Sequence, residues 1–426
     1  MTSEPASTKL PSLWRNRPYV LLLSGETVSQ FGAQITNVAM PIAAVSYLAA
    51  SEFEVGLLGA AQMAAFLLLG LPAGALVDRL SRRRVMIWAN VIRALLIAII
   101  PALWLMGELS VSWLVVLALL TGACAVFFDV AYMSIVPSLV PRAQLADANS
   151  RLESTMQTAR IAGPALGGAL AKIVAAPLLP IGATIGYLAS AFALSRIAND
   201  VPEPRAAGSR LWSEIREGTS FVFRHPIIGR IVASAAGANL FGSLIMTMMP
   251  ILILRELGFS ELLFGLLLTI GSVGAVAGGL TAPAIARRVG EGHAIVVTYI
   301  ATALAAFGFV AVFFVPDAWA FWVLAVTEFW MGFTILAFNV CQVSVRQKLC
   351  PPRLLGRMNA SIRFAVWGVS PVGAIASGVL ASQIGLEATF WIGAVGALAA
   401  SAFLVFSPLW RMRAVPEPDW YVAAGQ

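Results

Sequence analysis

Cysteine and histidine are scarce in this 426-residue chain, which has three Cys and two His. Cys124, Cys341 and Cys350 form no CxxC pair, and His225 and His293 stand alone, so no thiolate or imidazole cluster of a zinc or redox site is present in the sequence. The sequence also lacks a GxxxxGK[ST] phosphate-binding loop and an HExxH pair. We therefore expect a protein that is not an enzyme, with no catalytic residue, no bound metal and no cofactor.

Charged residues are equally sparse. They make up 12% of the chain, against about 25% in ordinary soluble domains, whereas 59% of the residues are hydrophobic. This composition predicts a membrane protein with several spans. The net charge of +7 arises from Lys and Arg in short loops between apolar runs. We interpret these residues as topology signals and contacts to membrane lipids, and we expect no nucleic-acid partner.

A membrane-spanning helix needs about 20 predominantly apolar residues, and twelve runs reach that length. We therefore predict an all-α fold with twelve transmembrane helices. The predicted spans cover residues 18–46, 54–78, 85–107, 112–137, 145–172, 177–197, 227–254, 261–286, 293–316, 319–345, 355–382 and 388–410.

The loops between these runs alternate between basic and acidic. Of the 28 Lys and Arg residues, only Lys172 and Arg255 fall in the acidic set of loops. Because basic loops stay on the cytoplasmic side, we expect both termini in the cytoplasm and a multi-pass location in the inner (cytoplasmic) membrane. The first 17 residues show no signal-peptide cleavage pattern and are expected to remain.

Residues 198–226 interrupt the pattern of spans. Apolar Trp212, Ile215 and Phe221 alternate there with charged Glu214 and Arg216, a spacing typical of a helix that lies in the membrane interface. We predict a cytoplasmic N-terminal tail (1–17), a six-helix bundle (18–197), this linker (198–226), a second six-helix bundle (227–410) and a cytoplasmic C-terminal tail (411–426).

The two halves also share a sequence pattern at a nearly constant offset. Gly56-Leu57-Leu58 recurs 209 residues later as Gly265-Leu266-Leu267, and Gly70-Leu71 recurs as Gly279-Leu280. At an offset of 210, the recurring positions are Pro141, Leu145, Asn149, Gly163, Gly168 and Leu170, matched by Pro351, Leu355, Asn359, Gly373, Gly378 and Leu380. This repeat predicts two pseudo-symmetric bundles with a cavity between them.

A basic hairpin joins the second and third runs with the sequence GALVDRLSRRR, residues 74–84. Its residues Gly74, Asp78, Arg79, Arg82 and Arg83 resemble the loop signature of the major facilitator superfamily. Ser81 stands where that family usually has Gly, and because Gly suits a positive φ, Ser81 predicts a different or strained turn. The resemblance implies a monomeric transporter of small molecules that works by alternating access.

Two further motifs resemble exporters of that superfamily. Gly163, Pro164, Gly167 and Gly168 are similar to its GPxxGG signature, whose small residues permit bending and close helix packing. The segments FFDVAY (127–132) and WSEIREGTSFVFRHP (212–226) resemble the branch with macrolide-type and enterobactin-type exporters.

The resulting expectation is secondary active export of small amphipathic compounds, drug-like or secondary metabolites, by proton antiport. The run 112–137 lacks the basic residue that many drug/proton antiporters carry there, which leaves proton coupling open. The alternatives are a dedicated siderophore or natural-product exporter, an uptake system, and a sensor or scaffold that transports nothing.

The same resemblance assigns a conformational latch to the hairpin. In the superfamily, the hairpin aspartate and arginines hold the outward-open state through a carboxylate on the fourth helix and the start of the eleventh. Asp129 occupies that place here. We therefore predict that Asp78, Arg82 and Asp129 form the latch, with Gly74, Arg79 and Arg83 in the same hairpin.

Ionisable residues within spans are costly, by about 2.5–3.5 kcal/mol on insertion scales, and each is either half of a buried ion pair or functional. There are six: Glu26, Arg93, Asp129, Arg160, Glu328 and Arg363. Glu26, Gln30 and Asn37 share one stripe of the first helix, which the resemblance places on the central cavity. We predict that Glu26 binds protons or substrate.

Two other helices supply candidates. A stripe of the tenth span carries Glu328, Phe338 and Asn339, and Arg363 on the next span could neutralise Glu328. The seventh span contributes Asn239 and Met246, whose adaptable thioether suits varied apolar ligands. Ordinary helix packing is the competing interpretation for these apolar side chains.

Overall fold

The computed structural model of the chain describes residues 12–77, 80–197, 211–351 and 354–414, and the regular structure within them is helical. The first half contains α1 (Arg17–Ile42), α2 (Glu52–Val77), α3 (Arg82–Met106), α4 (Val111–Leu139), α5 (Leu145–Ala171) and α6 (Pro180–Ser195). The second half contains α8 (Ile228–Ile251), α9 (Glu261–Val289), α10 (Glu291–Ala311), α11 (Asp317–Leu349), α12 (Leu355–Trp367), α13 (Ser370–Ile384), α14 (Leu386–Ala400) and α15 (Ala402–Val405). Helix α7 (Leu211–Arg224) lies between them in the chain.

The all-helical, multi-span fold class is confirmed. Within the described part of the chain, ten segments are long and apolar enough to cross a membrane. Helices α1 and α5 are not among them, although their 26 and 27 residues give each a length of about 40 Å. Both helices are long enough to span a bilayer of about 30 Å. Their polar residues account for the lower hydropathy, and together with the ten segments they make the expected twelve.

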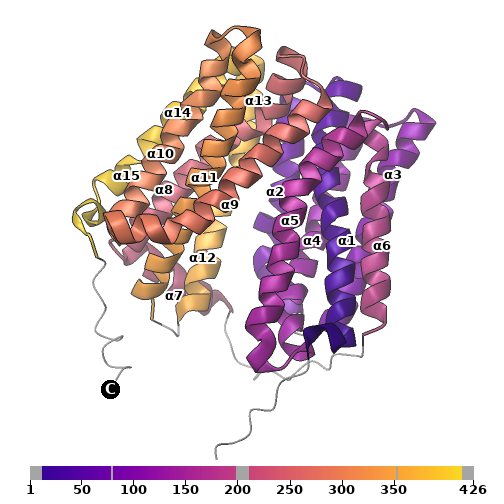
Figure 1. Cartoon of the computed structure of the whole chain (residues 1–426), viewed down its shortest axis with the longest axis horizontal. Helices are drawn as coiled ribbons and strands as arrows, with labels where there is room; N and C mark the ends of the chain where they lie inside the picture. The colour runs from indigo at the N-terminus through magenta and orange to yellow at the C-terminus, as the bar shows by residue number, and fades with distance from the viewer. Residues whose placement is uncertain (1–11, 78–79, 198–210, 352–353, 415–426) are drawn as a thin grey trace, which may run out of the picture.

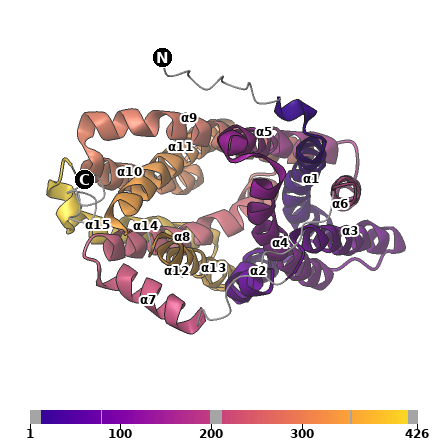
Figure 2. The same cartoon turned by 90° about the horizontal axis from the view of Figure 1, so that it is seen from below.

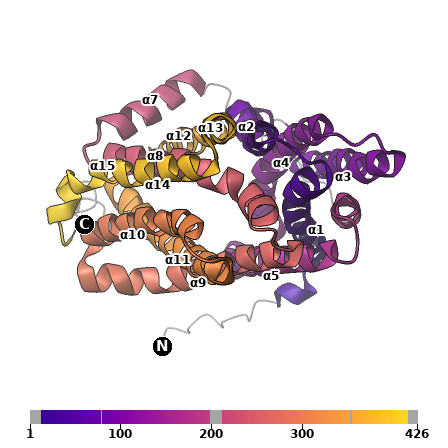
Figure 3. The ribbon, with the colours of Figure 1, turned by 90° about the horizontal axis from the view of Figure 1, so that it is seen from above.

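The helices gather into two groups that follow the chain. Figure 1 shows α1 to α6 on one side and α8 to α15 on the other, and the end-on views in Figures 2 and 3 show the same division. The run predicted as one span over 355–382 is divided between α12 and α13. A five-residue π-helical segment extends α1 (η2, Ala43–Tyr47), and another extends α8 (η5, Leu252–Glu256) at the equivalent place in the second half.

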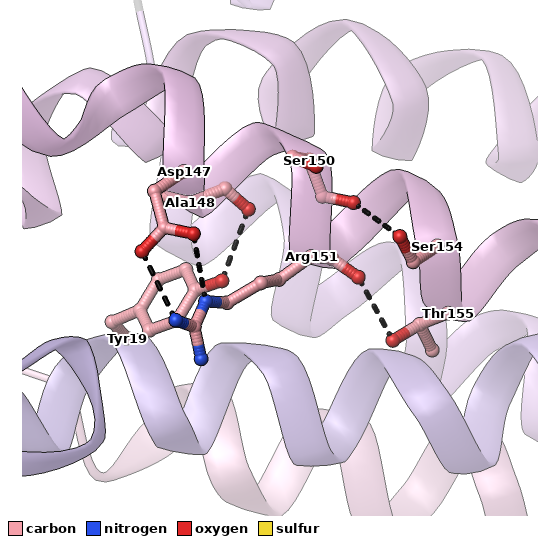
Figure 4. Close-up of polar contacts among 7 residues, drawn as sticks. All are labelled: Tyr19, Asp147, Ala148, Ser150, Arg151, Ser154 and Thr155. Carbon is pink, nitrogen blue, oxygen red and sulfur yellow. Dashed lines mark hydrogen bonds and ion pairs between the residues drawn. The ribbon is translucent and has the colours of Figure 1, made fainter.

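Polar contacts fasten α1 to α5 within the first half (Figure 4). The Tyr19 hydroxyl, on α1, donates to the Ala148 carbonyl oxygen at 3.0 Å. One turn away, the Arg151 guanidinium donates to both carboxylate oxygens of Asp147 at 3.0 and 3.1 Å and lies 5.1 Å from the Trp14 ring centroid. These contacts tie the start of α1 to the start of α5.

Helix α7 docks on the second half, where it runs beside α12 at the edge of the molecule (Figures 2 and 3). The Arg357 guanidinium of α12 donates to the Glu217 carboxylate, and the Thr219 and Ser361 hydroxyls lie 3.3 Å apart. At the start of α8, Nδ1 of His225 accepts from the backbone N–H groups of Ile227 and Ile228 at 3.3 Å. The linker helix is therefore anchored to α12, whereas its location at a membrane interface stays a prediction.

Candidate functional site

The two halves touch closely at one end of the molecule, through glycines of four helices. Gly56 of α2 lies against Gly378 of α13, where a Cβ added to Gly56 would come within 2.8 Å of the Gly378 Cα atom. Gly168 of α5 lies against Gly265 of α9, with a corresponding distance of 3.0 Å from an added Cβ on Gly265 to the Gly168 Cα atom. Only residues without a side chain allow backbones to approach this closely.

These two contacts are related by the sequence repeat. Gly56 and Gly265 are equivalent positions, as are Gly168 and Gly378. The contact of Gly56 with Gly378 is therefore the repeat-related copy of the contact of Gly265 with Gly168, and the two contacts close this end of the interface symmetrically. The GPxxGG glycines of α5 divide their roles: Gly167 lies against Ile35 of α1, whereas Gly168 reaches the second half.

A third contact at the closed end has no repeat-related copy. The Arg255 guanidinium of η5 donates to the Ala50 carbonyl oxygen at 2.5 Å and lies 3.4 Å from the Glu52 carboxylate at the start of α2. The position 209 residues before Arg255 is Ser46, which cannot form the equivalent ion pair. Arg255, one of the two exceptions to the charge distribution of the loops, thus connects the two halves.

A cavity of about 500 Å³ lies between the halves. Four of the predicted residues line it: Asn239, Met246, Phe338 and Asn339. Further lining residues come from α2, α10, α11 and α12, among them Gln62, Met63, Tyr299, Gln342 and Trp367. The sequence interpretation missed Gln62 and Met63, although Gln62 is the one amide in the apolar run 54–78 and could have been noticed for that reason.

The other candidates lie outside the lining of this cavity. Glu26 is buried within the first half, 5% exposed, and accepts a hydrogen bond from Gln30 Nε2 at 3.2 Å. Its second oxygen, Oε2, is buried without a partner. Arg93 and Asp129 lie within electrostatic range of Glu26, but the Arg93 guanidinium donates to the Tyr187 hydroxyl at 2.7 Å.

The predicted role of the α1 stripe at a substrate or proton site stays a prediction. Glu26, Gln30 and Asn37 are all absent from the lining, although Pro41 of the same helix is part of it. Glu26 is buried within the first half, whereas Gln30 is half-buried and Asn37 is exposed. The stripe is therefore not one buried face: it begins at a buried carboxyl group and ends at an exposed amide.

Glu328 likewise points to a neighbouring helix. Its side chain is 7% exposed, one carboxylate oxygen is buried without a hydrogen-bond partner, and the other lies against Gly271 of α9. Among the described residues, no ion pair joins Glu328 to Arg363. The α11 stripe is thus split, with Phe338 and Asn339 on the cavity and Glu328 against α9.

Arg363 and Asp129 meet instead at a second, smaller cavity between the halves, of about 130 Å³. The Arg363 guanidinium lies 5.0 Å from the centroid of the Phe66 ring, which also lines this cavity. The Phe66 ring is 6.1 Å from the Trp367 ring, which lines the large cavity. The Phe66 and Trp367 rings, one from each half, therefore lie between the large cavity and the smaller cavity that Asp129 and Arg363 line.

The basic hairpin is described in part. Asp78 and Arg79 lie outside the described residues, so the latch of Asp78, Arg82 and Asp129 stays a prediction. Arg83 donates to the carbonyl oxygens of Leu194 and Ser195 at 2.9 and 2.6 Å, which joins the hairpin to α6. Ser81 caps α3 with φ −63° and ψ 115°. The expected strain is therefore wrong, because this extended conformation suits any residue.

Comparisons with known proteins agree with this architecture. Over 410 residues the chain is 28% identical to the multidrug efflux pump Tap of Mycolicibacterium fortuitum, covering 92% of the chain and 96% of the pump. It is 26% identical to the uncharacterized transporter YfiS of Bacillus subtilis, covering 89% and 91%.

Among solved structures, the fold resembles the inward-facing state of a bacterial homologue of the iron transporter ferroportin, with TM-score 0.76, 17% identity and coverage of 93% and 99%. The outward-facing state of such a homologue gives TM-score 0.58 at 18% identity, with coverage of 91% and 98%. The sequence profile of the Major Facilitator Superfamily matches residues 22–372. The chain belongs to the Major Facilitator Superfamily of secondary transporters.

Proposed function

We propose that this protein exports small amphipathic organic compounds across the cytoplasmic membrane by alternating access. The observation that carries this proposal is the 500 Å³ cavity between two halves that are closed at one end by repeat-related glycine contacts. A cavity of this volume is in the range of drug-sized ligand sites, roughly 300–1,000 Å³. Because one chain completes the cavity, a monomer suffices. The units that move are residues 18–197 and 227–410.

The orientation follows from the charge of the loops. The end with the hairpin arginines and the Arg287-Arg288 pair is opposite the closed end, and the positive-inside tendency assigns it to the cytoplasm. Both termini then lie inside, and the closed end with Arg255 and Glu52 faces outward. The structure accordingly corresponds to an inward-facing state, which receives substrate from the cytoplasm or inner leaflet.

Export is favoured over uptake by the role of α5. The GPxxGG segment, an exporter signature by resemblance, supplies Gly168 to the contact that closes the outer end. The relative from Mycolicibacterium fortuitum is named an efflux pump. The finer resemblance to the macrolide-type and enterobactin-type branch belongs to this proposal as well, and it includes the alternative of a dedicated siderophore or natural-product exporter.

We assign proton coupling to the buried carboxyl groups. Charged carboxylates in the membrane interior are expensive, and both Glu26 and Glu328 are buried with one oxygen that has no hydrogen-bond partner. Glu26 lies in electrostatic range of Arg93 and Asp129, and Asp129 shares a cavity with Arg363. Protonation of Glu26 or Asp129 would change the net charge of these residues next to the interface between the halves.

Transport by membrane vesicles of inverted orientation tests the proposal. A panel of cationic, neutral and anionic amphiphiles is presented to vesicles with and without a proton gradient, alongside vesicles that lack the protein. Export requires that at least one compound accumulate in a gradient-dependent manner. If no compound moves, the transport-inactive sensor or scaffold is favoured, whereas accumulation in right-side-out vesicles alone would indicate uptake.

A further inference from the structure

The two halves line the large cavity unequally. The first half contributes Pro41 of α1 and five residues of α2, whereas the second half contributes residues of α8, α10, α11, α12, α13 and α14. Helices α10 and α14 pack against each other and against α8 within the second half (Figures 2 and 3). A cavity that reaches α10 and α14 therefore extends from the interface into the second bundle.

The exposure of the lining residues distinguishes the mouth of the cavity from its deep end. At the interface, Met246 and Trp367 are 41% and 55% exposed, and Gln62 is exposed as well. On α10 and α14, by contrast, Tyr299 and Ala397 are 2% and 8% exposed. We name the deep end the recess, and the residues of α10 and α14 that line it are Tyr299, Thr302, Ala303, Ala306 and Ala397.

The recess presents apolar surface to a ligand. The Tyr299 hydroxyl donates to the Ser234 carbonyl oxygen at 2.9 Å. The hydroxyl of half-buried Thr302 donates to the Thr298 carbonyl oxygen, also at 2.9 Å. The other recess residues are alanines. Because both hydroxyl protons are engaged, and a polar group buried without a partner costs free energy, the recess suits a hydrocarbon chain better than a polar group.

The repeat places a filled space in the first half where the second half has the recess. The Arg93 guanidinium of α3 lies 4.1 Å from the centroid of the Tyr187 ring of α6, and it donates to the Tyr187 hydroxyl at 2.7 Å. It also lies 5.9 Å from the centroid of the Phe128 ring of α4. The position 210 residues after Phe128 is Phe338, which lines the cavity.

Smaller residues stand at the corresponding places of the second half. The positions 209 and 210 residues after Arg93 are Thr302 and Ala303, and both belong to the recess. The position 210 residues after Tyr187 is Ala397. A long guanidinium side chain and a phenol ring are thus replaced by a short hydroxyl side chain and methyl groups. This difference between the halves leaves the recess open in the second half.

We propose that the second half binds the apolar part of the transported compound in the recess, and that Thr302 and Ala397 set the length of the apolar chain that fits. This inference rests on the proposed function, because it places the transported compound in this cavity. It adds a substrate class, amphiphiles with an unbranched apolar chain, and two residues that determine specificity. The polar end of the compound stays at the mouth, beside Gln62 of the first half.

Calorimetric binding to the purified full-length protein in detergent tests the inference. The methyl, butyl and octyl esters of 4-hydroxybenzoic acid serve as probes, with one polar end and chains of increasing length. Affinity for the wild type should rise with chain length, by up to about fourfold for each methylene group that enters the recess. Each variant is compared with the wild type for the same ester, so that partition of the ester into detergent cancels.

Substitutions in the recess should act according to chain length. Ala397→Tyr restores the ring of the first half, and it should weaken octyl ester binding roughly 15-fold, the equivalent of two displaced methylene groups, without affecting the methyl ester. Thr302→Ala enlarges the recess and should strengthen octyl ester binding about two- to fourfold. Thr302→Ala also keeps the test valid if the tyrosine variant does not fold.

Two control variants separate the size of the recess from other effects. Thr302→Val keeps the volume of the side chain and removes only the hydroxyl, and it should change no affinity. Ala399→Tyr makes the same substitution as Ala397→Tyr at an exposed position of α14, and it should leave all three esters unaffected.

The inference is overturned if no ester binds the wild type, if the octyl ester binds no tighter than the methyl ester, or if Ala397→Tyr and Thr302→Ala leave octyl ester binding unchanged. A loss of equal size for all three esters in Ala397→Tyr would also refute a role in chain length. The proposed function fails separately, when no compound moves in the vesicle assay. Transport without any dependence on chain length would refute the recess and retain the transport function.

Discussion

Adding one methyl group to Gly168 should open the closed end of the molecule. The Cβ of an alanine at this position would lie 2.5 Å from the Glu261 carbonyl oxygen and 3.1 Å from the Gly265 Cα atom. Both atoms belong to the backbone of α9, so no side chain can rotate aside. Overpacking of this kind costs about 1–3 kcal/mol, which corresponds to a shift of roughly 5- to 150-fold in a two-state equilibrium.

Spin-label distance measurements can detect this shift. Labels at Lys172→Cys in the first half and Glu387→Cys in the second are both exposed and both at the closed end. The three native cysteines are replaced beforehand. Because Gly168→Ala strains only the state in which α5 contacts α9, we expect the population with a longer distance between labels to increase. Transport should slow, since the inward-facing state is no longer favoured.

Two variants serve as comparison. Gly182→Ala places a methyl group on α6 where no atom lies within 4 Å, and it should leave the distance distribution unchanged. Gly378→Ala, the repeat-related substitution, brings a Cβ within 2.9 Å of the Glu52 carbonyl oxygen and should act in the same direction as Gly168→Ala. If Gly168→Ala and Gly182→Ala gave the same distribution, the glycine contacts would not control closure.

Five further substitutions test individual groups. Glu26→Gln should remove the pH dependence of transport, and an unchanged pH profile would eliminate it as a proton site. Glu328→Gln should raise the melting temperature, because it removes a buried carboxylate without an ionic partner; a fall would reveal a structural ion pair. Glu217→Arg should lower stability by up to about 1 kcal/mol, and adding Arg357→Glu should restore it. His225→Ala should lower the free energy of unfolding by about 1 kcal/mol, as for a lost helix cap. Burial lowers the pKa of the His225 imidazole, so its contribution to stability is present above pH of about 6.5 and is lost as pH falls through the lower folded-state pKa. A denaturation series from pH 7 to pH 5 should show this loss for the wild type and not for His225→Ala.

The sequence predicted the fold class because membrane spans depend mainly on the length of apolar runs. The run 261–286 corresponds to α9 (Glu261–Val289), and the run 145–172 corresponds to α5 (Leu145–Ala171). Single glycines also carried information, since equivalents in the repeat, such as Gly56 and Gly265, form equivalent contacts. The break within the run 355–382 was missed, although Gly368 and Pro371 mark the place where α12 ends and α13 begins.

The candidate site was predicted only in part, and the reason is geometrical. A stripe of polar residues identifies a face of a helix, but the sequence does not say which neighbour covers that face. Asn339 faces the cavity, whereas Glu328 on the same helix faces α9 because a long helix crosses several neighbours along its length. Two further contacts depend on how the two halves dock, which loop charges alone do not specify. These are the shared cavity of Arg363 and Asp129 and the ion pair of Arg255 with Glu52.

The central claim is that transport requires the two halves to separate at the end that is closed in this structure. A reversible cross-link between Glu52→Cys and Arg255→Cys, whose native side chains lie 3.4 Å apart, tests it directly. The protein is reconstituted in liposomes with a compound that the vesicle assay has identified, and a cleavable bismaleimide carrying a disulfide joins the two positions. We predict that complete cross-linking stops gradient-dependent transport and that reduction of the linker restores it. Transport at the full rate with the two halves joined would contradict the account.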